Sequence, residues 1–270
     1  MTMRNFESLG KKKAVIGLVH LLPMPGTPFF QEGDFERSLE KAVQDARALY
    51  EGGADGCLIQ TVDKVYPIQD EADPVRTAGV AVITHAVAQA TGEDFQIGVQ
   101  IMWNALSASA AAARVAGGSF LRCTALVGCT ESPFGRVEAN PLAFLNYRRA
   151  IGAQGLKLVA EVSGMHFHWA GEPKPAAEVA RMAAMVGADA VEVAHADEAQ
   201  NAALVRDIKA ANPGLTVFLG GFTNHENVQR RMAEADGVFV GSCLEKGRWG
   251  SAVDVEKVRR YVELVRQLER

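Results

Sequence analysis

Short apolar runs alternate with amphipathic segments along the whole chain. The runs are nearly continuous in Val, Ile, Leu and Phe, which is typical of parallel strands that are covered on both faces. Between them, apolar positions recur with a helical period, as in FERSLEKAVQDARALYEGG. The pattern predicts eight strands, at 14–20, 56–60, 96–102, 120–124, 157–162, 190–194, 216–221 and 237–242.

Eight strand–helix units in 270 residues predict an α/β fold of the (β/α)8 TIM-barrel type. We expect a single domain over 1–270, with 1–13 as an N-terminal lead-in. A doubly wound open sheet is the alternative, but it rarely has eight regular units without an inserted domain. The helix starts are indicated by four capping residues, Asp34, Asn140, Asn224 and Asp254.

The connections between these elements differ in length. Helix-to-strand links are short, as in EGGAD and VGAD. Several strand-to-helix links are long, at 21–34, 61–73, 125–140 and 163–174. Long loops belong on the catalytic face of a barrel and short loops on its stability face. The asymmetry favours an enzyme over a scaffold.

The seventh and eighth predicted strands both end in very small residues. Loops after these two strands often bind phosphate in (β/α)8 barrels, because backbone N–H groups can reach an anion only where no side chain blocks them. The helix predicted to open at Thr223 and Asn224 would add partial positive charge. Tight turns are the alternative explanation. The predicted phosphate-binding residues are Gly220, Gly221, Gly241 and Ser242.

Polar residues stand at or near the carboxyl ends of the other predicted strands, where a barrel core is otherwise apolar. Glu161 and Glu192 are predicted to act as general acid or base, and a buried salt bridge with Arg122 or a lysine is the alternative for each. His20 and Asn104 are the other predicted catalytic residues, placed to polarise a carbonyl or orient a hydroxyl. The predicted substrate-binding residues are Gln60, Arg122 and His195.

His166 and His168 form an H-x-H pair in the long loop after the fifth strand. In an extended segment both rings would face one side, where a divalent metal could bind beside Glu161. The alternative is an aromatic wall or lid built with Phe167 and Trp169. The sequence requires no cofactor and leaves a divalent metal open.

Composition narrows the range of partners. The net charge is −4, and no basic block beyond residues 11–13 suggests a nucleic-acid partner. The apolar runs are strand-sized, so we expect no membrane insertion, and the N-terminus lacks the apolar centre of a signal peptide. Four widely spaced cysteines fit a reduced, cytoplasmic protein. A homo-oligomer is left open.

Several motifs resemble those of the BtpA/SgcQ family, of which this chain looks like a divergent member. VIGLVHLLPMPGTP (15–28) resembles the family's opening, in which a histidine, a leucine and a Pro-x-Pro-Gly segment recur. EGGADGCLIQ (51–60), ENVQRRMAEADGVFVGS (226–242) and the Val-Asp pair at 253–254 follow in the family's order. The resemblance implies a barrel of the ribulose-phosphate-binding type. The family takes its name from photosystem I biogenesis in cyanobacteria, and other members lie among sugar-utilisation genes.

Three segments depart from the family pattern. Where members carry Gly-Asp-x-Pro-Phe after the second strand, this chain has QTVDKVYPIQD. Where they carry Arg-Asn-Asp after the third, Trp103 and Ala105 flank Asn104. Where they carry Lys-His-Ala after the fifth, EVSGMHFHWAGEP has no lysine. The phosphate end is kept and the reactive end is altered.

The leading hypothesis is an enzyme that performs acid–base chemistry on a phosphorylated small molecule such as a sugar phosphate. Isomerisation, epimerisation and aldol-type cleavage all fit. A metal-assisted hydrolase that uses His166 and His168 is the first alternative. The second is a non-catalytic assembly factor of the photosystem I biogenesis type, whose partner could contact the apolar loop at 23–30.

Overall fold

The computed structural model describes residues 4, 6, 7 and 9–269. Strands and helices alternate through this part of the chain. The strands are β1 (Ala14–His20), β2 (Gly56–Gln60), β3 (Gln96–Gln100), β4 (Phe120–Cys123), β5 (Cys129–Ser132), β6 (Gly135–Glu138), β7 (Lys157–Ser163), β8 (Ala190–Val193), β9 (Thr216–Leu219) and β10 (Gly237–Val240). The α-helices are α1 (Asp34–Glu51), α2 (Pro74–Ala90), α3 (Leu106–Ala116), α4 (Pro141–Ala150), α5 (Ala176–Met185), α6 (Glu198–Ala211), α7 (Val228–Arg231) and α8 (Val255–Arg266).

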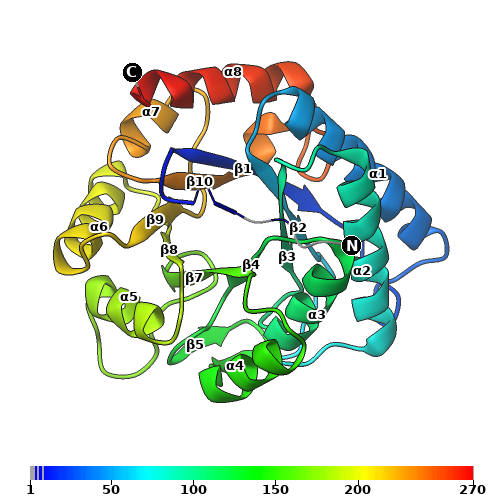
Figure 1. Ribbon diagram of the computed structural model, residues 1–270, viewed down its shortest axis with the longest axis horizontal. Coiled ribbons are helices and arrows are strands. Elements are labelled where there is room, and N and C mark those ends of the chain that lie inside the picture. The colour runs from blue at the N-terminus through cyan, green and yellow to red at the C-terminus, as the bar shows by residue number, and fades with distance from the viewer. Residues whose placement is uncertain (1–3, 5, 8, 270) are drawn as a thin grey trace.

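Eight parallel strands close into a barrel in the order β1-β10-β9-β8-β7-β4-β3-β2. Figure 1 shows the helices as an outer ring around these strands. The strands are almost entirely buried, which explains their nearly continuous apolar sequence. The predicted (β/α)8 fold is confirmed, and each barrel strand lies within its predicted segment or within one residue of it.

Two of the four predicted capping residues act as side-chain N-caps. Asn140 accepts the N–H of Ala143 at the start of α4, and Asp254 accepts two N–H groups at the start of α8. Asp34 is instead the first helical residue of α1. The helix predicted to open at Asn224 begins only at Val228, because the Asn224 side chain accepts backbone N–H groups within a preceding turn.

The predicted loop 125–140 contains a β-hairpin that the hydrophobic pattern did not reveal. β5 and β6 pair antiparallel around a turn at Pro133 and Phe134. The hairpin packs against the loop after β7, since Thr130 accepts the N–H of His168 at 3.0 Å. Its turn places the Phe134 ring 5.7 Å from the ring of Trp103, which lines the pocket described below.

Phenylalanine rings fill the barrel interior below the carboxyl ends of the strands. Phe239 lies 5.3 Å from Phe218 and 6.2 Å from Phe120, and Phe6 packs against Phe120 at 5.6 Å. Gly98 makes room for this layer, because a Cβ there would lie 2.2 Å from the Phe120 ring. The layer forms a closed floor beneath the carboxyl-terminal end of the barrel.

No helix in the described ranges is both long and apolar enough to cross a membrane.

Candidate active site

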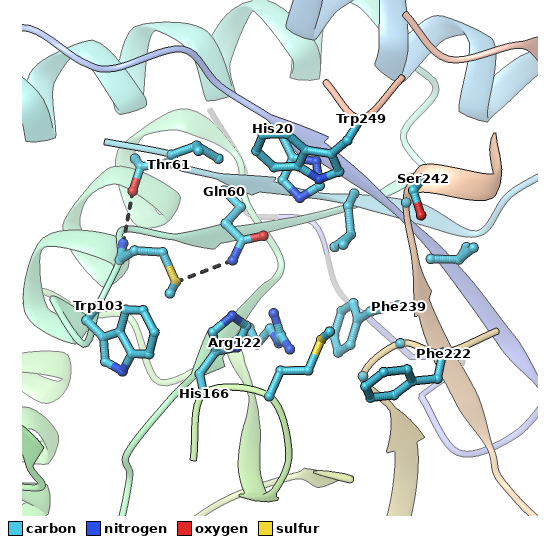
Figure 2. A pocket seen from close by; sticks show the side chains of 18 of the residues that line it. His20, Gln60, Thr61, Trp103, Arg122, His166, Phe222, Phe239, Ser242 and Trp249 are labelled. Atoms are coloured by element: carbon cyan, nitrogen blue, oxygen red, sulfur yellow. Dashed lines mark hydrogen bonds between the residues drawn. The ribbon is translucent and has the colours of Figure 1, made fainter. Parts of the chain in front are cut away.

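A cavity of about 420 Å³ opens at the carboxyl ends of the barrel strands. Its lining comes from β1, β2, β4 and β10 and from the loops that follow β2, β3, β7, β9 and β10. In Figure 2, Trp103 stands on one side and Ser242 and Phe222 on the other, with Arg122 and His166 between them. Of the seven residues predicted to be catalytic or substrate-binding, three line the cavity: His20, Gln60 and Arg122.

Arg122 lies at the floor of the cavity within a network of buried charges. Its Nε and Nη2 donate to the two oxygens of Glu192, at 2.6 and 2.5 Å. Nη2 also lies 3.3 Å from Glu161 Oε1, and the guanidinium stacks over Phe239 at 5.3 Å. Both carboxylates are fully buried behind it. The network joins β4, β7 and β8, and its formal charge before any histidine is counted is −1.

The network shifts the pKa values of its two carboxyl groups in opposite directions. Burial by itself raises the pKa of Glu161, but the charges of Arg122 and His166 and the hydrogen bonds from His166 outweigh it and hold the pKa at about 2. Burial, reinforced by the nearby charge of Glu161, raises the pKa of Glu192 despite its bond to Arg122. Burial also lowers the pKa of Arg122, yet the two carboxylates more than compensate and raise it. Arg122 and Glu161 are therefore ionised at neutral pH.

His166 connects this buried network to the cavity. Its Nδ1 lies 2.9 Å from Glu161 Oε1, and its backbone N–H donates to Glu161 Oε2 at 3.1 Å. The ring lines the cavity and meets Trp103 edge-on, with centroids 5.2 Å apart. Glu161 itself does not line the cavity, and two residues that do, His166 and Arg122, lie between it and the open space.

Two glycine loops form the opposite side of the cavity: residues 220–223 after β9 and residues 241–243 after β10. Gly221 has φ of 141°, a conformation that favours glycine. Among the described residues, no protein acceptor receives the backbone N–H of Gly221, Thr223 or Ser242. All three residues line the cavity.

The four predicted phosphate-binding residues thus all line the cavity, but Gly220 also has a packing role. Its N–H donates to Val193 O at 2.9 Å, and a Cβ there would lie only 1.8 Å from Glu192 Oε1. At Gly241 a Cβ would meet only Leu18 and His20, at 3.3 Å or more. Gly241 is the position where a side chain can enter the cavity.

His20 closes a third side together with Trp249, which comes from the loop after β10. The two ring centroids lie 5.1 Å apart with the ring planes tilted by 44°, and both side chains appear at the top of Figure 2. Glu245 holds this loop by accepting the N–H of Gly250 at 2.8 Å. The buried Nδ1 of His20 has no hydrogen-bond partner among the residues that the structure describes, and Glu245 Oε1 is 3.9 Å from it.

A buried ion pair organises the remaining wall. Arg76 pairs with Asp63 and donates to Thr61 Oγ1 at 3.0 Å and to Met102 O at 2.7 Å. Figure 2 shows Thr61 in turn accepting the N–H of Met102, at 3.0 Å. These bonds hold Met102, and with it the adjacent Trp103, next to the end of β2 that carries Gln60.

Asn104 and His195 lie outside the cavity lining. The Asn104 side chain donates to Ala125 O at 3.0 Å and accepts Ala125 N–H at 2.9 Å, so its polar atoms bond to the backbone. His195 Nδ1 accepts the N–H of Asp197 ahead of α6. Cys123 is fully buried, and burial raises the pKa of its thiol to about 12, which does not suit a nucleophile.

The H-x-H pair does not face one side. His166 lines the cavity, whereas His168 is exposed and does not. In the part of the chain that the structure describes, no group of three or more His, Cys, Asp or Glu side chains is placed to share a metal ion. The intervening Phe167 is fully buried and anchors the loop.

Sequence reasoning missed several lining residues. Half of them are aromatic or hydroxyl side chains on loops, where no hydrophobic period marks them: Thr61, Tyr66, Trp103, Phe222, Thr223 and Trp249. Position directly after a predicted strand is the one signal that could have found Thr61, Trp103 and Phe222.

The fold and this cavity define a (β/α)8 barrel with a pocket at the carboxyl ends of its strands, bordered by glycine loops after the last two strands. Residues 11–267 match the BtpA family, and the chain belongs to it. An uncharacterized protein of Archaeoglobus fulgidus is 31% identical over 93% of this chain and 98% of its own. The photosystem I biogenesis protein BtpA of Synechocystis is 27% identical, over 96% and 90%. The sgc region protein SgcQ of Escherichia coli is 26% identical, over 98% of both chains.

Solved structures share the fold at low sequence identity. Tryptophan synthase subunit alpha from Legionella pneumophila superposes with a TM-score of 0.63, at 15% identity over 95% of this chain and 94% of its own. Phosphoribosyl anthranilate isomerase from Thermus thermophilus gives a TM-score of 0.52 at 16% identity, over 94% and 99%. At this level of identity the likeness shows the barrel alone.

Proposed function

We propose that this chain is an enzyme that performs acid–base chemistry on a phosphorylated small molecule, most simply a sugar phosphate. The phosphate would bind between the two glycine loops, on the free N–H groups of Gly221, Thr223 and Ser242 and on the Ser242 hydroxyl. The observation that carries the proposal is that Gly221, Thr223 and Ser242, whose N–H groups have no acceptor among the described residues, line the same cavity as His166.

The chemistry is proposed from the groups at the other side of the cavity. His20 and His166 would exchange protons with substrate, and Gln60 and Arg122 would donate to an oxygen that gains charge. Glu161 and Glu192 would act from behind the lining, through His166 and Arg122. Isomerisation, epimerisation and aldol-type cleavage all need such a set. Phosphoribosyl anthranilate isomerase has the same fold, and it supports a phosphorylated substrate by analogy alone.

A ligand-binding test can be made without knowing the substrate. Thermal unfolding is measured with inorganic phosphate, ribulose 5-phosphate and dihydroxyacetone phosphate, each compared with its unphosphorylated counterpart where one exists. A ligand at about 100-fold excess over its Kd contributes about 2.7 kcal/mol, which is about 5 °C for a domain of this size. Stabilisation by the phosphorylated compounds alone is the expected result.

Gly241 supplies the matched pair of variants. Gly241→Asp places a negative charge in the cavity, and Gly241→Asn places a neutral side chain of the same shape there. We expect the aspartate variant to lose the response to phosphate and the asparagine variant to keep more of it. Equal responses from both variants, or stabilisation of the wild type by free sugars and phosphorylated sugars alike, would contradict phosphate binding at this site.

A non-catalytic binding role is the second candidate. The relative from Synechocystis is named for photosystem I biogenesis, and Phe29 and Val65, on the loops after β1 and β2, are 45% and 43% exposed. Substituting both by serine should abolish partner capture without changing the phosphate response. A phosphorylated ligand that binds tightly and undergoes no reaction would favour this role.

A further inference from the structure

The loop after β7 holds the His166 ring in one orientation. Gly164 N–H donates to Phe167 O at 2.9 Å, which turns the chain back toward the strand. Phe167 is fully buried, and the backbone N–H of His166 donates to Glu161. The ring itself is only 20% exposed. These contacts anchor the backbone on both sides of His166 and set its ring against Glu161 before any ligand arrives.

The contact with Glu161 also fixes which ring nitrogen carries the proton. A carboxylate that is ionised can only accept hydrogen bonds, and Glu161 Oε1 lies 2.9 Å from Nδ1. Nδ1 must therefore be the protonated nitrogen, since two lone pairs at that distance would repel. In the neutral imidazole this leaves the lone pair on Nε2.

Nε2 is free to act on a molecule in the cavity. It bonds to no described residue, and it is not among the fully buried polar atoms that lack partners. The ring meets Trp103 edge-on, and the preceding residue, Met165, lies against the other side of the cavity, where its Sδ would be 3.3 Å from a Cβ at Gly221. The loop that carries His166 thus reaches the glycine loops where the phosphate is proposed to bind.

We infer that His166 is the group that takes and returns protons in this cavity, and that Glu161 is its positioning residue. The inference rests on the proposed acid–base function and gives it a specific base. It replaces a direct role for either buried glutamate, because neither carboxylate borders the cavity. It also assigns His166 a role that needs no metal ion.

The step is a proton transfer from a carbon next to a substrate carbonyl. The Nε2–H bond forms as the C–H bond breaks, and the electron pair of that bond moves into the carbonyl, leaving an enolate oxygen. Gln60 and Arg122 are the donors that line the cavity for that oxygen. Return of a proton to the same carbon restores the carbonyl and balances the step, with no oxidant or reductant.

The test follows exchange of such protons with solvent. Ribulose 5-phosphate and dihydroxyacetone phosphate are incubated with the protein in D2O, and deuterium uptake next to the carbonyl is followed by proton NMR. We expect His166→Asn to slow uptake by at least about 100-fold, the usual contribution of a general base. The phosphate response in thermal unfolding should remain. His168→Asn is the matched control, since that ring is exposed outside the cavity, and it should leave both unchanged.

The role of Glu161 is tested by the tautomer of His166, which a merely structural residue would not change. In protein labelled with ¹⁵N-histidine, the side-chain signals that vanish in His166→Asn should report a protonated Nδ1 and a bare Nε2. In Glu161→Gln, whose amide can accept or donate, the two tautomers should mix. Uptake should fall by at least about 10-fold with KM unchanged.

The outcomes separate the two proposals. If the wild type exchanges and His166→Asn exchanges equally fast, or if Nε2 carries the proton in the wild type, the assignment of His166 is overturned while acid–base function stands. If the wild type exchanges neither probe although phosphate stabilises it, the acid–base function itself is overturned. Loss of exchange in His166→Asn with phosphate binding intact supports the assignment.

Discussion

Removal of the Arg122 charge tests the buried network most directly. Arg122→Leu keeps an apolar stem over Phe239 but leaves Glu161 and Glu192, both fully buried, without their cation. Breaking a buried ion pair by removing one partner costs about 3–5 kcal/mol, because an uncompensated charge stays in the interior. For a domain of this size that corresponds to a midpoint lower by about 6–10 °C.

A second substitution makes the prediction specific. Glu192→Gln alone keeps Arg122 paired with Glu161, so we expect a cost of no more than about 2 kcal/mol. Added to Arg122→Leu, the same change removes one stranded carboxylate. The double variant should therefore be more stable than Arg122→Leu at pH 7, although it departs further from the native sequence.

The assay is urea unfolding of the wild type, both single variants and the double variant at pH 7 and pH 5. In Arg122→Leu the folded-state pKa of Glu192 is raised further, so its ionisation costs stability above that pKa and the cost disappears as pH falls. The difference in the free energy of unfolding between Arg122→Leu and the double variant should be smaller at pH 5 than at pH 7. A loss below about 1 kcal/mol in Arg122→Leu, or a double variant less stable than the single one at pH 7, would refute this account of the network.

Three further changes have predictable effects. The pKa of Glu161 is held at about 2, against an ordinary 4.5. Ionised Glu161 therefore adds about 3 kcal/mol of stability above pH 4.5, which is lost as pH falls toward 2. In Glu161→Gln the free energy of unfolding should depend less on pH over that range, and an unchanged pH dependence would count against this. Gly220→Ala should lower the stability measured by thermal unfolding by about 1–3 kcal/mol, because its Cβ would overlap the Glu192 carboxylate. Gly247→Ala is the control and should cost far less, because its Cβ would meet its nearest neighbour only at 3.7 Å. Equal costs would contradict the packing argument. Asp254→Ala should remove the N-cap of α8 and cost about 1 kcal/mol in the same measurement, with Asp254→Asn as the variant that keeps most of it.

The barrel could be predicted from the sequence because its signal is repeated eight times. Each strand is an apolar run, and each helix adds an independent period, so small errors at element ends did not alter the fold. The hairpin β5–β6 was missed because a half-exposed pair of short strands carries neither signal. The start of α7 was missed because Asn224 caps a turn as readily as a helix.

The site was only partly predictable for a different physical reason. Strand ends can be read from the sequence, and His20, Gln60 and Arg122 were found in that way. Whether Glu161 meets solvent, an arginine or a histidine depends on side chains brought together from β4 and from the loop after β7. No spacing along the chain encodes that meeting.

The phenylalanine floor limits how substrate and product can enter and leave the cavity. Phe6, Phe120, Phe218 and Phe239 are fully buried and fill the barrel beneath Arg122, so no molecule can pass through the barrel interior. A ligand must therefore enter and leave from the carboxyl-terminal end. A departing product and an arriving substrate then exclude each other, and product inhibition of any reaction carried out here should be competitive with substrate.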